Sequence, residues 1–87
     1  MDLNVYSVFD IAADVYMRPV FFSTEELLLR SLVHLLRSGD DVMAQFPEQF
    51  QVYLLGTFDD VTGCLNCHEP KWIVNLNTLL KPSKTEE

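Results

Sequence analysis

The sequence predicts an α+β fold, in which a four-stranded antiparallel sheet from two hairpins packs against one long helix. Two observations carry this prediction. Residues 50–58 alternate in polarity and run into an acidic turn, as in a strand of a β-hairpin. Residues 24–38 place leucines at helical spacing, which is typical of a helix that covers a sheet. A short helix or irregular segment over residues 72–80 is expected to complete the fold.

The first hairpin is expected to join residues 4–10 to residues 16–22 through a connection at residues 11–15. Both segments are rich in apolar and aromatic side chains, which favour strands. Between the two hairpins and after the helix, residues 40–49 are expected to form a loop with one helical turn at residues 42–46.

The second hairpin is the clearest local pattern. Pro47 cannot extend a helix, and it biases Phe46 away from helical angles. The strand over residues 50–58 is followed by a turn that contains Asp59, Asp60 and Gly63. The two carboxylates can accept hydrogen bonds from backbone N–H groups of the turn, and the glycine can take a positive φ. A returning strand over residues 63–66 is therefore expected.

The helix is expected to span residues 24–38. Ser23 can cap its N-terminus, with Glu26 bonding back in a capping box, and Gly39 follows as a C-terminal stop. The leucines spread over a wide apolar arc, and the charged residues cluster on the other side. Packing on the sheet is favoured over a helical dimer interface. Leu27 lies off the main arc, which makes it the best-placed contact with another chain.

Length and composition limit the possible classes of protein. The 87 residues suffice for one domain with a modest core, and they are few for an enzyme with a buried cleft. Because 48% of the residues are hydrophobic, a single folded domain is expected over residues 1–80, followed by a polar, frayed tail over residues 81–87. A sheet backed by one helix leaves a face or edges uncovered, so a homodimer is expected.

No targeting or membrane segment is apparent. No apolar run approaches the roughly 20 residues of a membrane helix, and the N-terminus lacks the basic and apolar regions of a signal peptide. No membrane contact is therefore expected, and the protein should stay in the cytosol.

The charge balance is acidic, with a net charge of −7. Between residues 38 and 70 there is no lysine or arginine, whereas the acidic residues there are Asp40, Asp41, Glu48, Asp59, Asp60 and Glu69. Nonspecific nucleic-acid binding draws most of its free energy from counterion release by clustered Lys and Arg. Either the six basic residues gather on one face, or direct DNA binding is weak. An acidic surface also suits a basic protein partner, mimicry of DNA, or simple solvation.

A basic ridge is expected along the polar face of the helix, formed by Arg30, His34 and Arg37 at i, i+4, i+7 spacing. These residues are the best candidates for phosphate contacts. The favoured alternative is structural, because Glu26 can pair with Arg30 and Arg37 can complement the negative end of the helix dipole. Arg18 and Lys71 extend the ridge only if the fold brings them close.

Aromatic side chains offer a second means of binding single strands, because bases stack on them with little sequence preference. The residues first in line for this role are Tyr6, Tyr16 and Tyr53. Most aromatic positions are nevertheless expected to form the core, since they lie in strand-like segments with apolar neighbours. The hydroxyls of Tyr6 and Tyr53 suit half-exposed positions. Trp72 is expected to begin the C-terminal segment that covers one end of the core.

The segment Cys64-Leu65-Asn66-Cys67-His68 has the form of a haem-attachment site. Covalent haem attachment belongs to exported proteins, and this chain has no recognisable signal peptide. A zinc site would need a fourth ligand, for which His34 or a carboxylate remains. Two reduced thiols on the strand after the hairpin are the preferred interpretation, so no metal or cofactor is predicted.

No arrangement of catalytic residues is visible. The chain has no Gly-rich phosphate loop, no GxSxG and no HExxH. The pair Asp59 and Asp60 lies in a turn that has too few ligands for a calcium loop. A non-enzymatic protein is therefore expected.

Several segments resemble one phage family. They are Tyr6-Ser7-Val8-Phe9-Asp10, Arg18-Pro19, Phe21-Phe22, Tyr53-Leu54-Leu55-Gly56 and the hairpin at residues 46–63. In register they resemble the small non-structural protein of gokushoviruses, single-stranded DNA phages of the Microviridae, over residues 4–80. The resemblance implies a DNA-binding protein in the host bacterial cytoplasm. It also implies a role in the switch from duplex replication to the synthesis and packaging of single strands.

Two functional hypotheses follow. In the first, the protein binds single-stranded DNA through arginines and exposed tyrosines as a dimer. In the second, it is an acidic interaction module that regulates the phage replication initiator or a host replication protein and touches no DNA. Basic residues clustered on one face would favour the first hypothesis, and an even spread would favour the second.

Overall fold

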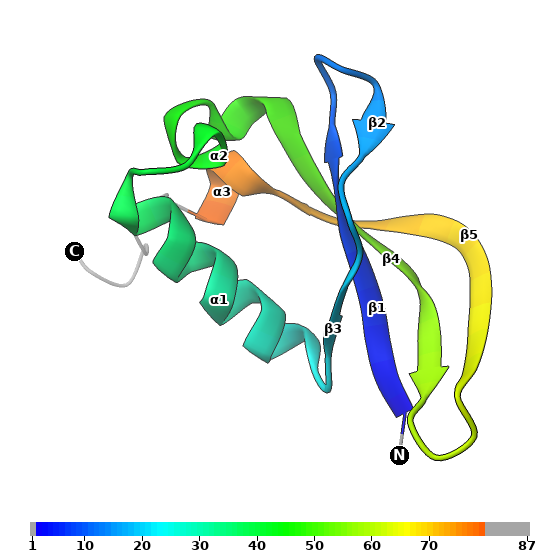
Figure 1. The fold of residues 1–87 in the computed structure, drawn as a ribbon. Coiled ribbons are helices and arrows are strands. Elements are labelled where there is room, and N and C mark those ends of the chain that lie inside the picture. The colour runs from blue at the N-terminus through cyan, green and yellow to red at the C-terminus, as the bar shows by residue number, and fades with distance from the viewer. Residues whose placement is uncertain (1, 80–87) are drawn as a thin grey trace.

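The computed structural model describes residues 2–79 and contains one curled antiparallel sheet with helices packed on it (Figure 1). Its elements are β1 (Asp2–Asp10), β2 (Val15–Tyr16), β3 (Val20–Phe22), α1 (Glu25–Ser38), α2 (Val42–Gln45), the 3-10 helix η1 (Pro47–Gln49), β4 (Phe50–Asp59), β5 (Cys64–Asn75) and α3 (Leu76–Leu79). The predicted α+β fold is confirmed. The predicted tail over residues 81–87 lies outside the described residues.

The sheet is four strands wide. Its order is β2-β1-β4-β5, and β3 follows β2 along the same edge of β1. The predicted single strand over residues 16–22 is thus two short pieces. Pro19 lies between them and has no N–H to donate to the sheet. The intervening chain stays attached to β1, because the Met17 N–H donates to the Val8 carbonyl (2.8 Å) and the Ser7 hydroxyl donates to the Met17 carbonyl (2.6 Å).

Helix α1 and its N-cap each begin one residue later than predicted. Thr24, not Ser23, is the N-cap, and its hydroxyl accepts a hydrogen bond from the Leu27 N–H (3.2 Å). This shift places Leu27 where a capping box needs Glu or Gln, so the predicted box does not form. The predicted stop is confirmed, since Gly39 lies in the left-handed region at φ 76°. The predicted helical turn at residues 42–46 is confirmed as α2.

The core lies between α1 and one face of the sheet. Leu28, Leu32 and Leu36 point from α1 onto this face and are at most 8% exposed. They pack against Tyr6, Val8, Phe50 and Val52 of the sheet, Met43 of α2 and Leu76 of α3. The prediction that the leucines pack on a sheet is therefore confirmed. Leu27 remains 43% exposed.

The outer strand β5 is longer than predicted. It continues from Cys64 to Asn75, although a strand only to residue 66 was expected. Trp72 consequently lies within β5 and not at the start of a C-terminal cover. That cover begins at Leu76, which is fully buried and opens α3. Proline is tolerated in an outer strand, which is why Pro70 does not end β5.

The turn between β4 and β5 has the predicted form. The Asp59 carboxylate accepts hydrogen bonds from the N–H groups of Val61 (2.9 Å) and Thr62 (3.4 Å), and Gly63 has φ 80°. The hydrogen bond from the Val61 N–H is the main reason why the pKa of Asp59 lies below its ordinary value.

Within residues 2–79, no helix is long and apolar enough to cross a membrane.

Two β-bulges curl the sheet near Gly56. Val5 pairs with Gly56 whereas Tyr6 pairs with Leu54, so Leu55 is an extra residue in β4. Gly56 also pairs with Cys67 of β5. A Cβ atom at Gly56 would collide with the Asn66 carbonyl oxygen and lie 2.8 Å from the Cys67 Cα atom. Only glycine permits this close approach of the two strands.

We expect Gly56→Ala to lower the free energy of unfolding by about 3 kcal/mol, because the backbone of β5 must move to admit the methyl group. Urea denaturation followed by circular dichroism measures the change. Gly39→Ala is the matched control, since nothing lies within 4 Å of a Cβ atom there. Gly39→Ala should lower the free energy of unfolding by only about 1 to 2 kcal/mol, because alanine is strained at the positive φ of this position. Equal losses in the two variants would contradict the close approach at Gly56.

Tyr6 should make stability sensitive to alkaline pH. Burial raises the pKa of the Tyr6 hydroxyl above its ordinary value of 10.0. The hydrogen bond from Asn4 opposes this shift, and the charge of Glu25 adds to it. As the pH rises past 10.0, the Tyr6 hydroxyl loses its proton in the unfolded state before it does so in the folded state. The unfolded state then binds fewer protons, so the free energy of unfolding falls as the pH rises.

The expected result is a steeper loss of stability between about pH 9 and about pH 11 in the wild type than in Tyr6→Phe. Urea denaturation at several pH values measures it. Tyr16→Phe is the control and should keep the wild-type slope. If Tyr6→Phe kept that slope too, the Tyr6 hydroxyl would not be buried in its neutral form.

Candidate nucleic-acid interface

One face of the sheet carries no helix in the part of the chain that the structure describes. Leu28 of α1, Met43 of α2 and Leu76 of α3 all belong to the core on the other face. In Figure 1 the three helices lie together on one side of the strands. Since side chains alternate along a strand, Ser7 and Phe9 of β1 point away from this core. We call the helix-free side the open face.

Four aromatic side chains form a row across the open face. They are Tyr16 of β2, Phe9 of β1, Tyr53 of β4 and Trp72 of β5. The ring centroids are 4.8 Å apart for Phe9 and Tyr16, 5.6 Å for Tyr16 and Tyr53, and 6.1 Å for Phe9 and Tyr53. Trp72 is the cross-strand partner of Tyr53. We call these four residues the aromatic row.

The aromatic row is open to solvent, and three uncharged polar residues lie beside it on the same face. Tyr16 is 44% exposed and Trp72 is 56% exposed. The polar residues that share this face beside the row are Ser7, Gln51 and Asn75. The Tyr53 hydroxyl donates to Gln51 Oε1 (3.1 Å), and the Trp72 indole N–H donates to Asn75 Oδ1 (3.0 Å). Flat rings held in this way suit contact with planar, apolar ligand surfaces such as nucleic-acid bases.

A second apolar group lies further along the open face. Phe21 and Phe58 have ring centroids 5.5 Å apart, and their cross-strand neighbours include Leu3 and Leu65. Phe21 is 44% exposed and Leu65 is 56% exposed. We call Leu3, Phe21, Phe58 and Leu65 the apolar patch.

The structure brings two of the three tyrosines named from the sequence together. Tyr16 and Tyr53 both belong to the aromatic row. Tyr6 does not, because it lies on the helix-covered face and is 1% exposed, so its expected half-exposed position is wrong. Its ring is part of the core, and its hydroxyl accepts a hydrogen bond from the Asn4 side chain (3.0 Å).

The basic residues named from the sequence do not gather around the aromatic row. Those of the helix, Arg30, His34 and Arg37, are exposed on α1, which lies beyond the other face of the sheet. The Arg30 Nη2 atom lies 3.6 Å from Glu26 Oε2, which is the ion pair expected if Arg30 has a structural role. Arg18 follows β2 at one edge of the sheet, and Lys71 lies in β5 at the opposite edge, next to Trp72. Arg18 and Lys71, the two residues that could have extended the basic ridge, therefore lie at opposite edges of the sheet.

The six acidic residues of residues 38–70 are also away from the aromatic row. Asp40 and Asp41 precede α2, Glu48 lies in η1, Asp59 and Asp60 lie at the β4–β5 turn, and Glu69 lies in β5. None of these positions is a cross-strand neighbour of the four rings. Two other carboxylates are nearer in sequence, because Asp10 follows Phe9 in β1 and Asp14 lies in the turn before β2.

Sequence reasoning missed Phe9 and Trp72 as members of an exposed site. Phe9 was expected in the core because its neighbours in sequence are apolar. Trp72 was assigned to a segment after the sheet, since Pro70 suggested a break. The β-forming run Trp72-Ile73-Val74 was the available indication that the strand continues.

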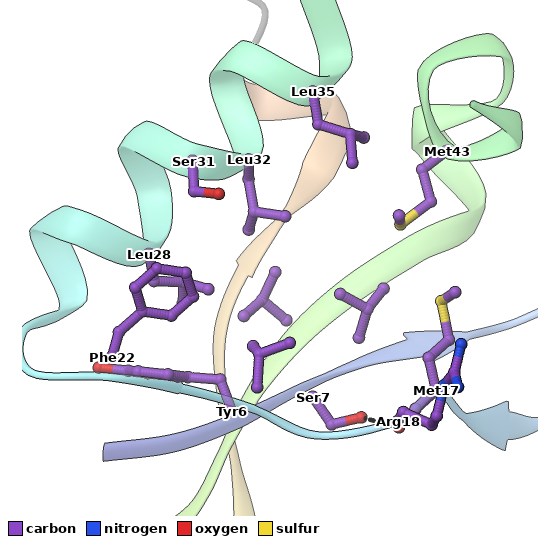
Figure 2. A pocket seen from close by; sticks show the side chains of 13 residues that line it. Tyr6, Ser7, Met17, Arg18, Phe22, Leu28, Ser31, Leu32, Leu35 and Met43 are labelled. Atoms are coloured by element: carbon purple, nitrogen blue, oxygen red, sulfur yellow. Dashed lines mark hydrogen bonds between the residues drawn. The ribbon is translucent and has the colours of Figure 1, made fainter. Parts of the chain in front are cut away.

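An apolar pocket lies on the other face, between α1 and β1, with a volume of about 200 Å³ (Figure 2). Leu28, Leu32 and Leu35 line it from the helix. The Ser7 hydroxyl is engaged by the Met17 carbonyl, and Arg18 is the one charged side chain among the lining residues. The pocket offers space for a small apolar group and no pair of groups suited to catalysis.

The two cysteines have free thiols. Cys64 and Cys67 are exposed on β5, opposite Asp59 and Gly56, as the preferred interpretation expected. His68 Nδ1 lies 2.7 Å from the Glu69 carbonyl oxygen. Among residues 2–79, no three His, Cys, Asp or Glu side chains gather in a way that could hold a metal ion.

Comparison with known proteins gives one match. The model of a family described as phage ORF5 protein matches residues 3–79. No curated protein and no solved structure matches significantly. Because the family match spans nearly every residue that the structure describes, the chain belongs to the phage ORF5 protein family.

Proposed function

We propose that this phage protein is a non-enzymatic factor that binds single-stranded DNA across the aromatic row. The observation that carries the proposal is the row itself, four adjacent aromatic side chains that cross all four strands on an uncovered face. Stacking of a base on an aromatic ring contributes about 1 to 3 kcal/mol and is tolerant of sequence. A duplex hides the faces of its bases, so such a row prefers single strands.

The net charge of −7 is compatible with this proposal if stacking supplies most of the affinity. The basic residues nearest to the row in sequence are Arg18 and Lys71, at opposite edges of the sheet. Arg18 also lines the pocket on the other face, and Lys71 pairs with the core-side Leu54, so they can supply at most two phosphate contacts at the edges of the row. Two phosphate contacts on a single strand correspond to a slope of about −1.4 in log Kobs against log salt concentration. Binding should therefore depend weakly on salt.

We also propose a biological role for this DNA binding. The sequence resemblance supports a gokushovirus origin within the Microviridae, and the phage ORF5 family match is consistent with it. On that basis the protein acts in the host bacterial cytoplasm. It binds newly displaced single strands when replication switches from duplex DNA to the synthesis and packaging of single-stranded genomes.

A second candidate function is an acidic interaction module. Its support is the separation of the basic residues by the sheet and the exposed carboxylates in the connections. In this role the acidic loops would contact a basic surface of the phage replication initiator or a host replication protein. The DNA-binding role is preferred because acidic loops are common on soluble proteins, whereas an exposed aromatic row is rare on monomers.

We also propose that the protein forms a homodimer through the apolar patch. Phe21 and Leu65 expose contiguous apolar surface, and surfaces of this kind mark contacts with other chains. A second copy would cover the patch and bring a second aromatic row to the same DNA, which raises the apparent affinity.

We expect Trp72→Ala to weaken binding of a single-stranded oligonucleotide of about 12 nucleotides by roughly tenfold, because one stacking contact is lost. Tyr16→Ala should weaken it by a similar factor. Fluorescence anisotropy of the labelled oligonucleotide, at low and near-physiological salt, measures the dissociation constant. Phe46→Ala is the matched control, since Phe46 is 45% exposed and lies outside the row, and it should bind as the wild type does.

Two outcomes would contradict this assignment. If Arg30→Glu combined with Arg37→Glu abolished binding and Trp72→Ala did not change it, the interface would lie on α1. If the wild type showed no saturable binding even at low salt, DNA binding would be rejected and the interaction module would take its place.

For the dimer, we expect sedimentation equilibrium of the wild type to give twice the mass of the chain, and Leu65→Asp to give the mass of one chain. The aspartate charge would be buried within the apolar contact, which is unfavourable. Val61→Asp is the control, because Val61 is 80% exposed in the turn and lies outside the patch. A wild type that stays monomeric at high concentration would refute the dimer.

A further inference from the structure

We propose that two amide side chains beside the aromatic row, Gln51 and Asn75, make the site selective for bases that carry carbonyl oxygens, with thymine preferred over adenine. This inference rests on the proposed binding of single-stranded DNA. It goes beyond stacking, because stacking alone gives little sequence preference.

The two amides form a block with two rings of the row. Gln51 and Asn75 are cross-strand partners on β4 and β5, and Tyr53 and Trp72 are the neighbouring partners on the same strands. A β-bulge separates the two pairs in β5, so that Trp72 and Asn75 are three residues apart and still meet on the open face. A base stacked on Tyr53 or Trp72 would therefore have its edge beside an amide.

The hydrogen bonds within the block orient the amides. The Trp72 indole nitrogen is only a donor, so the atom that faces it must be the Asn75 carbonyl oxygen (3.0 Å). The Asn75 NH₂ group then points away from the indole ring. Gln51 is arranged in the same way, with its Oε1 accepting from the Tyr53 hydroxyl (3.1 Å). Both amides thus use their acceptor within the block and keep their donors for a ligand.

Amide donors distinguish the bases. Thymine offers the carbonyl oxygens O2 and O4, whereas adenine has ring nitrogens and an amino group that is itself a donor. In single strands these edges are free for hydrogen bonds while the faces stack. Thymine can accept from both NH₂ groups through O2 and O4. An adenine edge that carries the amino group offers one ring nitrogen as acceptor, so its amino group faces the second amide donor. A mismatched base that cannot accept one of these hydrogen bonds binds less tightly. The amide N–H and the amino group of the base both lose water on binding, and neither gains a partner.

The test compares oligothymidylate with oligoadenylate of about 12 nucleotides, with the quenching of Trp72 fluorescence as the readout. Trp72 is the single tryptophan of the chain, so the signal comes from the site itself. We expect the wild type to bind oligothymidylate roughly tenfold more tightly than oligoadenylate. Gln51→Leu and Asn75→Leu should each reduce that ratio several-fold.

Adenine strands also stack on themselves, which lowers their affinity for any protein. This effect belongs to the oligonucleotide and persists in every variant, so the change in the ratio isolates the amides. Asn66→Leu is the matched control, because Asn66 is an exposed asparagine of β5 that pairs with Thr57, away from the row. It should keep the wild-type ratio.

The outcomes separate this inference from the function on which it rests. Binding of both strands with a ratio that Gln51→Leu and Asn75→Leu leave unchanged overturns the base selection and retains the DNA-binding role. Binding of neither strand overturns both. A reduced ratio in Gln51→Leu alone, which leaves α3 untouched, is sufficient support should Asn75→Leu fail to fold.

Discussion

The packing of α1 on one face of the sheet is the constraint on which the rest of the structure depends. Within residues 2–79, α1 is the one long helix, and its leucines cover one side of the sheet. Burial of the Leu28, Leu32 and Leu36 side chains stabilises the fold by about 1.5 to 3 kcal/mol each. The same packing decides which residues of each strand remain outside. The aromatic row is thus exposed because no helix among residues 2–79 packs on the second side of the sheet.

The bulges determine how that open face is composed. A regular β4 would alternate without interruption from Phe50 to Asp59, and Phe58 would then lie on the side of the core. The extra residue at Leu55 reverses the alternation, so Tyr53 and Phe58 both emerge on the open face. Gly56 makes the reversal possible, because the backbone of β5 leaves no room for a Cβ atom at that point of β4. The bulge therefore divides the open face into the aromatic row and the apolar patch.

Local patterns in the sequence were sufficient to predict the fold class, the helix and the acidic turn. The amphipathic arc of α1 and the Asp59 to Gly63 turn depend on near neighbours in the chain, and both agree with the structure. The site was harder to predict, because it depends on register. The run Val5-Tyr6-Ser7-Val8 is buried throughout, so its pattern does not reveal which side meets the helix. Trp72 joins Tyr53 only through a pairing between strands that the local sequence does not specify.

The irregular course of β5 limits how copies of this protein can meet edge to edge. An outer strand of 12 residues would ordinarily be a template on which further strands assemble without limit. Here Pro70 lacks one donor, Lys71 adds a charge, and the shifts in pairing bend the strand away from a straight edge. Polymerisation along the edge is thereby discouraged, while the flat surfaces of the open face stay available. High concentrations of the protein are thereby compatible with a sheet that ends at β5 and does not continue into fibres.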